Sequence, residues 1–287
     1  MIHSTAIIHP KAELDPSVNV GPYAVIDEAV RVGARCRIGP HVHLTGHTEI
    51  GEDNVFHSNC VIGDGPQDLK YRDAPTRLRV GSQNVFREQV TVHRSNNEEE
   101  DTVVGDRNYF MVNSHVGHNC RIGSHVILAN GAMVGGHVQI SDHVFISGNC
   151  LIHQFVRIGT LAMMQGGAGI SRDLPPYTMA RGANRICGLN VVGLRRAGIS
   201  AADRAELNSL YHALFRDGLP LRQAIESNRE RFSSAHAHAL LDFVASSRRG
   251  VCIDFTLRED PRENAADIQE ESGSAGSSLE ERSPGSP

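Results

Sequence analysis

Histidine is the residue type in this sequence whose abundance and spacing point most directly to chemistry. The chain of 287 residues has 16 histidines, and four of them fall in one stretch: His115, His118, His137 and His153. An imidazole changes charge near neutral pH, so it can act as a general base toward a hydroxyl nucleophile. It is also the commonest metal ligand, and on a surface it can simply hydrogen-bond to its neighbours. The choice between these uses depends on whether the fold brings the four side chains together.

A six-residue repeat of aliphatic side chains sets the spacing of these histidines. From Ile2 to Ile170, every sixth position holds Ile, Leu, Val, Phe or Met, except at Asp68, Ala74 and Glu98. A period of six does not match the 3.6-residue period of an α-helix. It fits a three-sided coil in which one aliphatic side chain per hexad points inward, while a small residue, often the glycine that follows, lets the chain turn a corner. The sequence therefore predicts a parallel β-helix of three hexads per turn, with turns about 4.8 Å apart.

Three hexads per turn place residues 18 apart on top of each other, so His118, Gly136 and Gln154 form one column. The adjacent positions carry the other histidines, which gathers His115, His118, His137 and His153 near one edge of the coil. A backbone N–H at Gly136 would lie one coil, about 4.8 Å, from His118. That is close enough to contribute to an oxyanion hole. We therefore favour general-base catalysis over a metal site or purely structural histidines.

Two segments interrupt the repeat without shifting its phase. Residues 64–79 and 95–103 lack the aliphatic spacing, and the same phase resumes after each of them. They are expected to be loops that leave otherwise regular coils. Loops on rigid scaffolds often carry function, although a solvated excursion is equally compatible with the acidic second loop.

From about Ser200 the six-residue pattern gives way to helical signals. Ser200 followed by Asp203 is typical of a helix N-cap with an acidic residue in the first turn. An amphipathic run continues to Gly218, and further helices are expected to begin near Pro220 and Ser234, with the last ending at Gly250.

The sequence thus predicts an all-β domain, a parallel β-helix of residues 1–190, followed by a small α-helical domain of residues 191–255. Residues 256–287 are rich in Ser, Gly, Glu and Pro and hold few apolar residues. Such a segment cannot bury enough apolar surface to order itself, so we expect a disordered tail.

Composition excludes several classes of protein. A net charge of −5 argues against a nucleic-acid binder. No apolar run approaches the ~20 residues of a membrane helix, so no membrane insertion is expected. Six cysteines without a CxxC motif favour a reducing, cytoplasmic location. Aromatic residues make up 5% and tryptophan is absent, which suits the narrow interior of a β-helix.

Several short motifs give the chain a resemblance to a known family. They are Gln67-Asp68-Leu69-Lys70-Tyr71, His115-x-x-His118, His153-Gln154-Phe155, Pro175-Pro176-Tyr177 and Gly193-Leu194-Arg195-Arg196. Hexad repeats are shared by a wide transferase superfamily, but with these motifs the chain resembles the UDP-N-acetylglucosamine 3-O-acyltransferases of lipid A biosynthesis. The resemblance extends from Met1 to about Gly250.

The resemblance implies a left-handed β-helix that assembles as a homotrimer with active sites between adjacent subunits. It implies transfer of an (R)-3-hydroxyacyl chain from acyl carrier protein to the 3-hydroxyl of UDP-N-acetylglucosamine, the first step of lipid A biosynthesis. No cofactor and no metal are expected for this reaction.

The resemblance also implies a role for individual residues. His118 would be the general base and Gly136 the oxyanion donor. Asp68 and Lys70 would hold the sugar. A guanidinium fork suits phosphate, so Arg196, with Asn190, would meet the uridine and phosphate end. The other expected substrate-binding residues are His115, His137, His153, Gln154 and Gly166.

Gly166 falls where the family sets the length of the acyl chain. A glycine there is permissive for a longer chain, although Met163, Met164 and Gln165 lie beside it.

Asn119 is a departure from the family pattern. Members commonly follow the catalytic histidine with Asp, which would stabilise an imidazolium, whereas Asn can orient the ring without adding charge. The related N-acyltransferase that acts two steps later often carries His-Asn but has an additional N-terminal domain. In this chain the hexads begin at Ile2.

The sequence is compatible with three alternatives. One is an N-acyltransferase on a 3-amino sugar nucleotide or a related acceptor. Another is a metal-dependent hexad enzyme of the carbonic anhydrase type, and the last is a non-catalytic scaffold. The C-terminal arginines are either a docking surface for an acidic carrier protein or solvated helix faces; they are Arg195, Arg196, Arg216, Arg222, Arg248 and Arg249.

Overall fold

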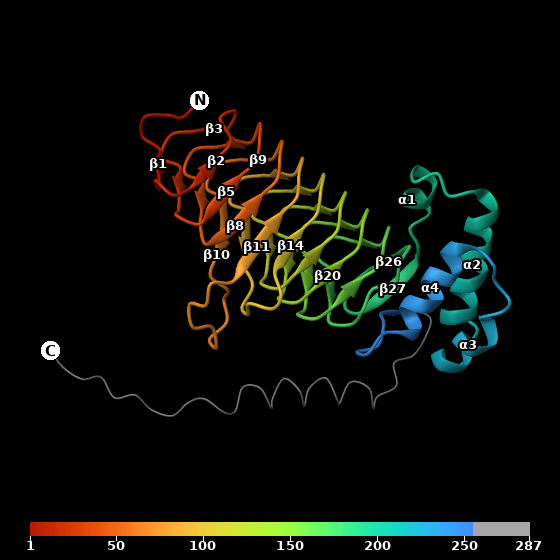
Figure 1. The fold of residues 1–287 in the computed structure, drawn as a ribbon. Helices are drawn as coiled ribbons and strands as arrows, with labels where there is room; N and C mark the ends of the chain where they lie inside the picture. Colours follow the sequence, from red (N-terminus) through yellow and green to blue (C-terminus); the bar gives the residue numbers. More distant parts are fainter. Residues whose placement is uncertain (255–287) are drawn as a thin grey trace, which may run out of the picture.

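The computed structural model describes residues 1–254, and these form a long three-sided β-helix closed at one end by four helices (Figure 1). The expected tail of residues 256–287 lies outside the described residues. The division into domains at residue 190 stays a prediction.

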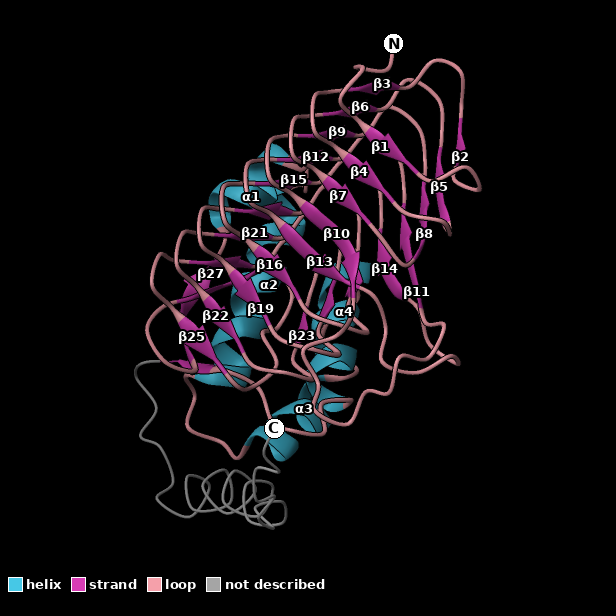
Figure 2. Ribbon diagram, turned by 90° about the vertical axis from the view of Figure 1, so that its left-hand side faces the viewer, coloured by secondary structure: helices cyan, strands magenta, loops and turns pink. Residues whose placement is uncertain are grey.

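Three parallel sheets make the sides of the β-helix, and the chain visits them in turn. Short strands of two to four residues suffice in most coils because each strand is paired above and below. The first sheet, whose strands cross the front of Figure 2, contains β1 (Ile7–Ile8), β4 (Val25–Ile26), β7 (His43–Leu44), β10 (Val61–Asp64), β13 (Thr91–His93), β16 (His115–Val116), β19 (Met133–Val134), β22 (Leu151–Ile152) and β25 (Gly169–Ile170).

The second sheet carries the charged side of the coil. It contains β2 (Glu13–Leu14), β5 (Val30–Val32), β8 (His47–Ile50), β11 (Arg77–Val80), β14 (Thr102–Val104), β17 (Arg121–Ile122), β20 (Gln139–Ile140) and β23 (Arg157–Ile158).

The third sheet runs the full length of the β-helix and continues into its helical end. It contains β3 (Asn19–Val20), β6 (Arg37–Ile38), β9 (Val55–Phe56), β12 (Val85–Phe86), β15 (Tyr109–Phe110), β18 (Ile127–Leu128), β21 (Phe145–Ile146), β24 (Met163–Met164), β26 (Thr178–Ala180), β27 (Arg185–Leu189) and β28 (Ile253–Asp254).

The register between coils confirms the predicted 18-residue turn. Val116 pairs with Val134, and Ile122 pairs with Ile140. Across the two interruptions, Val80 pairs with Ile50 on one side and Val104 on the other, so both extra segments leave the coil as loops without disturbing the phase.

The corners of the coil are built differently from the sequence prediction. We expected the glycine after each aliphatic residue to make the turn, but the left-handed φ belongs to non-glycine residues such as Asn119 (φ 57°) and His137 (φ 59°). Asn and His tolerate this region better than most residues. The glycines instead allow close stacking: a β-carbon on Gly33 would lie 2.7 Å from the Gly51 carbonyl oxygen of the next coil.

Four helices cap the C-terminal end: α1 (Val191–Arg196), α2 (Ala201–Phe215), α3 (Leu221–Asn228) and α4 (Ala235–Ala245). The predicted starts are correct, since the Ser200 and Ser234 side chains accept hydrogen bonds from the third backbone N–H of α2 and α4. α4 ends at Ala245 rather than at Gly250. The sequence signals do not predict α1, because this helix has only six residues and lacks a capping signal of the Ser-x-x-Asp type.

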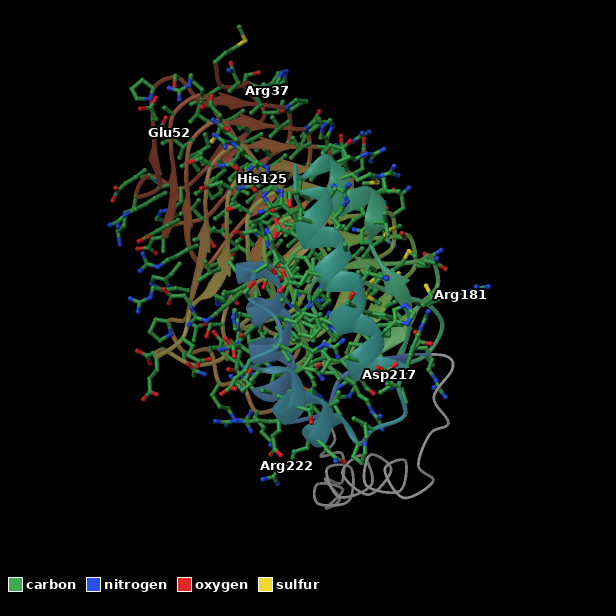
Figure 3. The ribbon with its side chains drawn as sticks, turned by 90° about the vertical axis from the view of Figure 1, so that its right-hand side faces the viewer. Arg37, Glu52, His125, Arg181, Asp217 and Arg222 are labelled. Atoms are coloured by element: carbon green, nitrogen blue, oxygen red, sulfur yellow. The ribbon has the colours of Figure 1, made fainter. Side chains whose placement is uncertain are left out.

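The chain end ties these helices back to the β-helix. β28 pairs in parallel with β27, which itself runs antiparallel to β26. Asp254 of β28 is buried and accepts hydrogen bonds from the Tyr211 hydroxyl of α2 and from Arg216. Figure 3 shows the helices packed over the end of the coil, with Asp217 and Arg222 at their outer side.

A column of phenylalanines fills the middle of the coil, and we predict that it is the most sensitive part of the core. Phe86 is fully buried, stacks on Phe56 with ring centroids 4.7 Å apart and contacts Phe110 at 5.0 Å. Phe86→Ala should lower the free energy of unfolding by about 3–5 kcal/mol because the rigid coils cannot close the cavity. Urea denaturation of this variant beside Ile7→Ala, whose side chain is 65% exposed, tests it; equal losses would contradict the prediction.

Candidate active site

A hollow of about 660 Å³ lies on the first sheet, against the edge where that sheet meets the second. This edge, which we call the histidine edge, consists of residues 117–120, 135–138 and 153–156. Of the predicted site residues, the hollow is lined by His115, His118, Gly136, His153 and Gln154. The column predicted from the 18-residue turn is therefore present and open.

The hydrogen bonds of His118 determine which tautomer its neutral ring adopts. His118 Nδ1 lies 2.8 Å from Asn119 Oδ1, and the backbone N–H of Asn96 donates to that same oxygen at 3.0 Å. Because a backbone N–H can only donate, the Asn119 atom is the amide oxygen, an acceptor. His118 Nδ1 must then carry the proton, and Nε2 of the neutral ring holds the free lone pair. The ring is thus oriented with its basic nitrogen away from Asn119.

Asn119 is in turn held by the second loop. Asn119 is buried, and its Nδ2 donates to Ser95 Oγ at 3.0 Å. Ser95 Oγ donates to the Asn97 carbonyl at 2.6 Å, and the Asn119 backbone N–H donates to Thr102 Oγ1 at 2.7 Å. Every polar atom of the amide has a partner, which fixes its direction. The acidic loop of residues 95–103 is therefore structural support for His118 rather than a solvated excursion alone.

The same loop connects His118 to the first loop. The Asn96 side-chain amide donates to Asp68 Oδ2 at 2.9 Å, and the Lys70 backbone N–H donates to Asp68 Oδ1 at 2.9 Å. The hydrogen bond from Lys70, and then that from Asn96, keep the pKa of Asp68 below its usual range. Asp68 and Lys70 do not line the hollow, but the adjacent Gln67 does, so the Asp68 carboxylate lies next to it.

Gly136 lies directly over His118. A β-carbon on Gly136 would be 2.7 Å from His118 Nε2, so only glycine lets the ring occupy this position. The next residue is tied to His118, because the His137 N–H donates to the His118 carbonyl at 2.8 Å. Within residues 1–254 we find no acceptor for the Gly136 N–H. An unused donor next to Nε2 is the arrangement that an oxyanion requires.

His115 and His93 form the inner wall of the hollow. Their rings meet edge to face with centroids 4.9 Å apart, and His115 Nδ1 lies 2.7 Å from Thr91 Oγ1. Burial lowers the pKa of His115 to about 4, with smaller contributions from His93 and His118. Burial also lowers the pKa of His93. Both rings are consequently neutral hydrogen-bonding groups at neutral pH.

His137 lies on the far side of the edge. Its ring meets that of His118 edge to face at 5.1 Å and stacks on Phe155 at 4.5 Å, and burial lowers its pKa. His137 therefore contacts His118 without lining the hollow.

Three predicted residues lie away from the hollow within one chain. Gly166 lies at the edge between the third and first sheets, in the segment that joins β24 to β25. Asn190 caps α1, and its Nδ2 donates at 2.9 Å to the carbonyl of Leu161, which lies at the edge between the second and third sheets. Arg196 is the last residue of α1.

The six-residue pattern did not identify His93 and Gln67, which line the hollow, or Asn96, which hydrogen-bonds to Asn119 and Asp68. His93 and Thr91 belong to the same strand, and Thr91 pairs with His115. These two residues are 24 apart in the sequence rather than 18, because the second loop adds residues to this turn. The 18-residue spacing alone therefore does not place His93 beside His115. Gln67 and Asn96 lie on loops, where no repeat spacing applies.

Within residues 1–254, no three His, Cys, Asp or Glu side chains are arranged to hold a metal ion. No helix in this part of the chain is long and apolar enough to cross a membrane.

Family models match the two parts of the chain that the geometry distinguishes. Residues 29–64 and 101–136 match the bacterial transferase hexapeptide repeats. Residues 173–252 match domain 2 of UDP-N-acetylglucosamine O-acyltransferase. Among curated proteins, the acyl-[acyl-carrier-protein]–UDP-N-acetylglucosamine O-acyltransferase of Thermodesulfovibrio yellowstonii is 43% identical over 88% of this chain and 98% of its own length. The chain belongs to the UDP-N-acetylglucosamine O-acyltransferase family.

Further relatives agree with this assignment. The enzyme of the same name from Syntrophobacter fumaroxidans is 44% identical over 87% of this chain and 98% of its own. The crystal structure of the Francisella novicida UDP-N-acetylglucosamine acyltransferase superposes with a TM-score of 0.84 at 32% identity, covering 98% of this chain and all of that one. The Arabidopsis acyltransferase gives 0.78 at 33%, covering 88% and 99%. These comparisons confirm the family, the left-handed β-helix with C-terminal helices, and an acyltransferase enzyme.

The neutral state of His115 predicts a pH dependence of stability in this acyltransferase. The folded pKa of about 4 lies below the ordinary value of 6.5. The contribution of neutral His115 to the free energy of unfolding is therefore fully present above pH 6.5. It is lost as pH falls toward 4, because the histidine of the unfolded chain binds its proton at a higher pH than the folded one. His115→Gln should reduce the slope of the free energy of unfolding against pH in this range by up to about 1.4 kcal/mol per pH unit.

Urea denaturation between pH 7 and 5 measures this slope. His125→Gln, at the edge between the second and third sheets where His125 stacks on His143, is the matched control. A slope that is unchanged by His115→Gln would show that its folded pKa is not depressed.

Proposed function

We propose that this enzyme transfers an (R)-3-hydroxyacyl chain from acyl carrier protein to the 3-hydroxyl of UDP-N-acetylglucosamine, the first step of lipid A biosynthesis. The observation that carries this proposal is the fixed tautomer of His118, whose basic Nε2 lies under Gly136. The identities of the donor and the acceptor come from the relatives, which are named acyl-[acyl-carrier-protein]–UDP-N-acetylglucosamine O-acyltransferases.

The reaction uses the His118–Gly136 pair in both steps. His118 Nε2 takes the proton of the 3-hydroxyl while the hydroxyl oxygen attacks the thioester carbonyl. The Gly136 N–H donates to the resulting oxyanion. When the tetrahedral intermediate collapses, the C–S bond breaks and the imidazolium returns the proton to the departing thiolate. The products are the 3-O-acyl sugar nucleotide and the free thiol of the carrier.

Polar groups around the hollow would hold the sugar. The Asp68 carboxylate is kept ionised by its donors, so it can accept hydrogen bonds from sugar hydroxyls. His115, a neutral ring, and Lys70 of the same loop as Asp68 are assigned to the sugar as well. His153 and Gln154 complete the surroundings of the acceptor, and His137 is assigned to substrate binding from the other side of His118.

The nucleotide residues require a second copy of the chain. Asn190 and Arg196 lie on α1 at the end of the third sheet, whereas the hollow lies on the first sheet. A site that uses both must join the first sheet of one subunit to the third sheet of another.

The outward residues of the coil support such an assembly. The second sheet presents charged and polar residues such as Glu49, Arg79 and Arg121. The first and third sheets present apolar ones, for example Leu151, which is 60% exposed, and Phe145. Packing the first sheet of each copy on the third sheet of the next is a head-to-tail contact, and three copies close it into a ring. We assign the enzyme this homotrimer.

Gly166 is assigned to the far end of the acyl groove. A β-carbon built there would meet only the Gly148 carbonyl oxygen, at 3.6 Å. The open space at this position favours a longer acyl chain than a bulky residue would admit.

A cytoplasmic location belongs to the same proposal. All six cysteines are free thiols, and burial raises the pKa of Cys60, Cys120 and Cys252 to about 12, so these three are poor nucleophiles. The chemistry assigned to His118 requires neither a cofactor nor a metal.

His118→Ala should reduce product formation by at least about a thousandfold, because no other group replaces the base at Nε2. Mass spectrometry of reactions with 3-hydroxyacyl carrier protein and UDP-N-acetylglucosamine measures the 3-O-acyl product. Circular dichroism and the thermal midpoint, unchanged from the parent, show that the fold is intact. Retained activity in this variant would contradict the assignment of His118 as the general base.

The same assay separates hydroxyl from amine acceptors. The proposal expects UDP-N-acetylglucosamine to react faster than its 3-amino analogue. A large preference for the analogue would make the enzyme an N-acyltransferase.

Sites shared between subunits predict complementation. His118→Ala and Arg196→Ala should each be nearly inactive alone. When the two variants are unfolded, mixed equally and refolded together, about a quarter of the intersubunit sites receive an intact His118 and an intact Arg196. Activity should therefore recover to about a quarter of the parent level. No recovery in mixed trimers confirmed by native mass spectrometry would place both residues in one subunit's site.

A further inference from the structure

A second hollow, of about 710 Å³, lies on the other side of the histidine edge. It is formed by the second sheet and by the segment that follows α4, and no step of the proposed reaction uses it. We call it the arginine hollow after four of its residues: Arg121, Arg157, Arg248 and Arg249. The remaining charged groups in its lining are Glu100 and Asp173, so its side chains carry a net charge of +2.

These arginines differ in how far they are already satisfied. Arg157 donates to the buried Asp173 carboxylate at 2.9 Å and stacks on Phe243, so it is a structural part of the wall. Arg121 and Arg248 are exposed, and within residues 1–254 neither has a carboxylate partner. Two guanidinium groups are therefore free to meet an anion.

Arg249 connects the two hollows. One of its terminal nitrogens donates to the backbone carbonyl of Gln154, a residue that lines the first hollow. Its Nε is buried and has no acceptor among the described residues. A buried donor without an acceptor costs about 1–3 kcal/mol, and an anion that reached this guanidinium would offset that cost.

The first hollow accounts for only part of what the reaction must bind. Three groups meet at His118 in an acyl transfer: the sugar, the acyl chain, and the arm that carries the thioester sulfur. The sugar is assigned to the first hollow, and the far end of the acyl chain is assigned to Gly166, at the edge between the third and first sheets. The surface that leads from His118 across the edge is the stack of His137 on Phe155, and Phe155 is 54% exposed. Both residues also line the arginine hollow.

We propose that the arginine hollow binds the phosphodiester of the donor's 4′-phosphopantetheine arm, with Arg121 and Arg248 as its ligands and the His137–Phe155 stack as the track of the arm toward His118. A guanidinium offers several donors to the phosphate oxygens. The exposed ring and the imidazole suit the methyl and amide groups of a pantetheine arm. This inference rests on the proposed function, since it concerns the donor of that reaction.

The choice among the basic residues follows from the contacts. Arg216 donates to Asp254 at 3.0 Å and Arg222 pairs with Glu226 at 3.2 Å, so both have carboxylate partners already. Figure 3 shows Arg222 at the outer end of the helical part, directed away from the coil. Of the C-terminal arginines, Arg248 therefore combines proximity to the histidine edge with a free charge.

The test compares two small donors that differ only in the phosphate: a 3-hydroxyacyl thioester of 4′-phosphopantetheine and the same thioester of pantetheine. In the parent enzyme, the phosphorylated donor should have a KM about tenfold or more below that of the other. In the Arg121→Gln/Arg248→Gln variant, the ratio of the two KM values should fall to about one. The KM for UDP-N-acetylglucosamine reports on whether the acceptor side is disturbed.

Arg37→Gln is the matched control, because Arg37 is an exposed arginine at the other end of the β-helix. The phosphate advantage should be retained in that variant. Equal KM values for the two donors in the parent enzyme would overturn the proposal. So would a phosphate advantage that survives in the double variant.

A failure of the proposed function is distinguishable from a failure of this inference. If neither donor acylates UDP-N-acetylglucosamine, titration calorimetry with 4′-phosphopantetheine and with pantetheine still measures the site. Tighter binding of the phosphorylated compound, lost in the double variant but kept in Arg37→Gln, supports the arginine hollow. Equal binding of the two compounds overturns it.

Discussion

The vertical register between coils is the constraint on which the rest of this structure depends. Each inward aliphatic side chain, such as Val116, stacks on its counterpart one turn above, and a slip by one residue would turn that column outward. The glycines that follow the aliphatic residues keep the backbones close enough to pair. The contact between His118 and Gly136 is a direct product of this register, because these two residues share no sequence motif and meet only through an 18-residue turn.

The two loops exploit the rigidity of the coil. Both leave and rejoin it without changing the register, so their length is free to vary while their ends stay fixed. The first supplies Asp68, the second supplies Ser95 and Asn96, and the two are joined by the hydrogen bond from Asn96 to Asp68. The polar network around His118 is therefore assembled from two loops that lack the six-residue repeat. The coil that carries these loops is built from that repeat throughout.

The sequence predicts the repetitive coil well and the non-repetitive loops poorly. The repeat predicted the coil, its three sides and the column of His118, Gly136 and Gln154, because stacking converts spacing directly into distance. Capping signals at Ser200 and Ser234 predicted where two helices begin. The repeat could not place Asn96, which depends on how a loop folds back. It ends near Ile170, so it gave no position for Asn190 or Arg196 relative to the hollow.

The asparagine at position 119 follows from the hydrogen-bond direction of the second loop. Ser95 Oγ gives its single proton to the Asn97 carbonyl, so toward Asn119 it can only accept. An amide satisfies this, since Nδ2 donates to Ser95 and Oδ1 accepts from Asn96 and His118. An aspartate at position 119 would place a second acceptor next to Ser95 Oγ. The serine could then donate to that carboxylate only by giving up its hydrogen bond to the Asn97 carbonyl. The second loop, which holds Asp68 through Asn96, and the neutral Asn119 beside His118 are thus parts of one network. In this network an amide fixes the tautomer of His118 without contributing a charge.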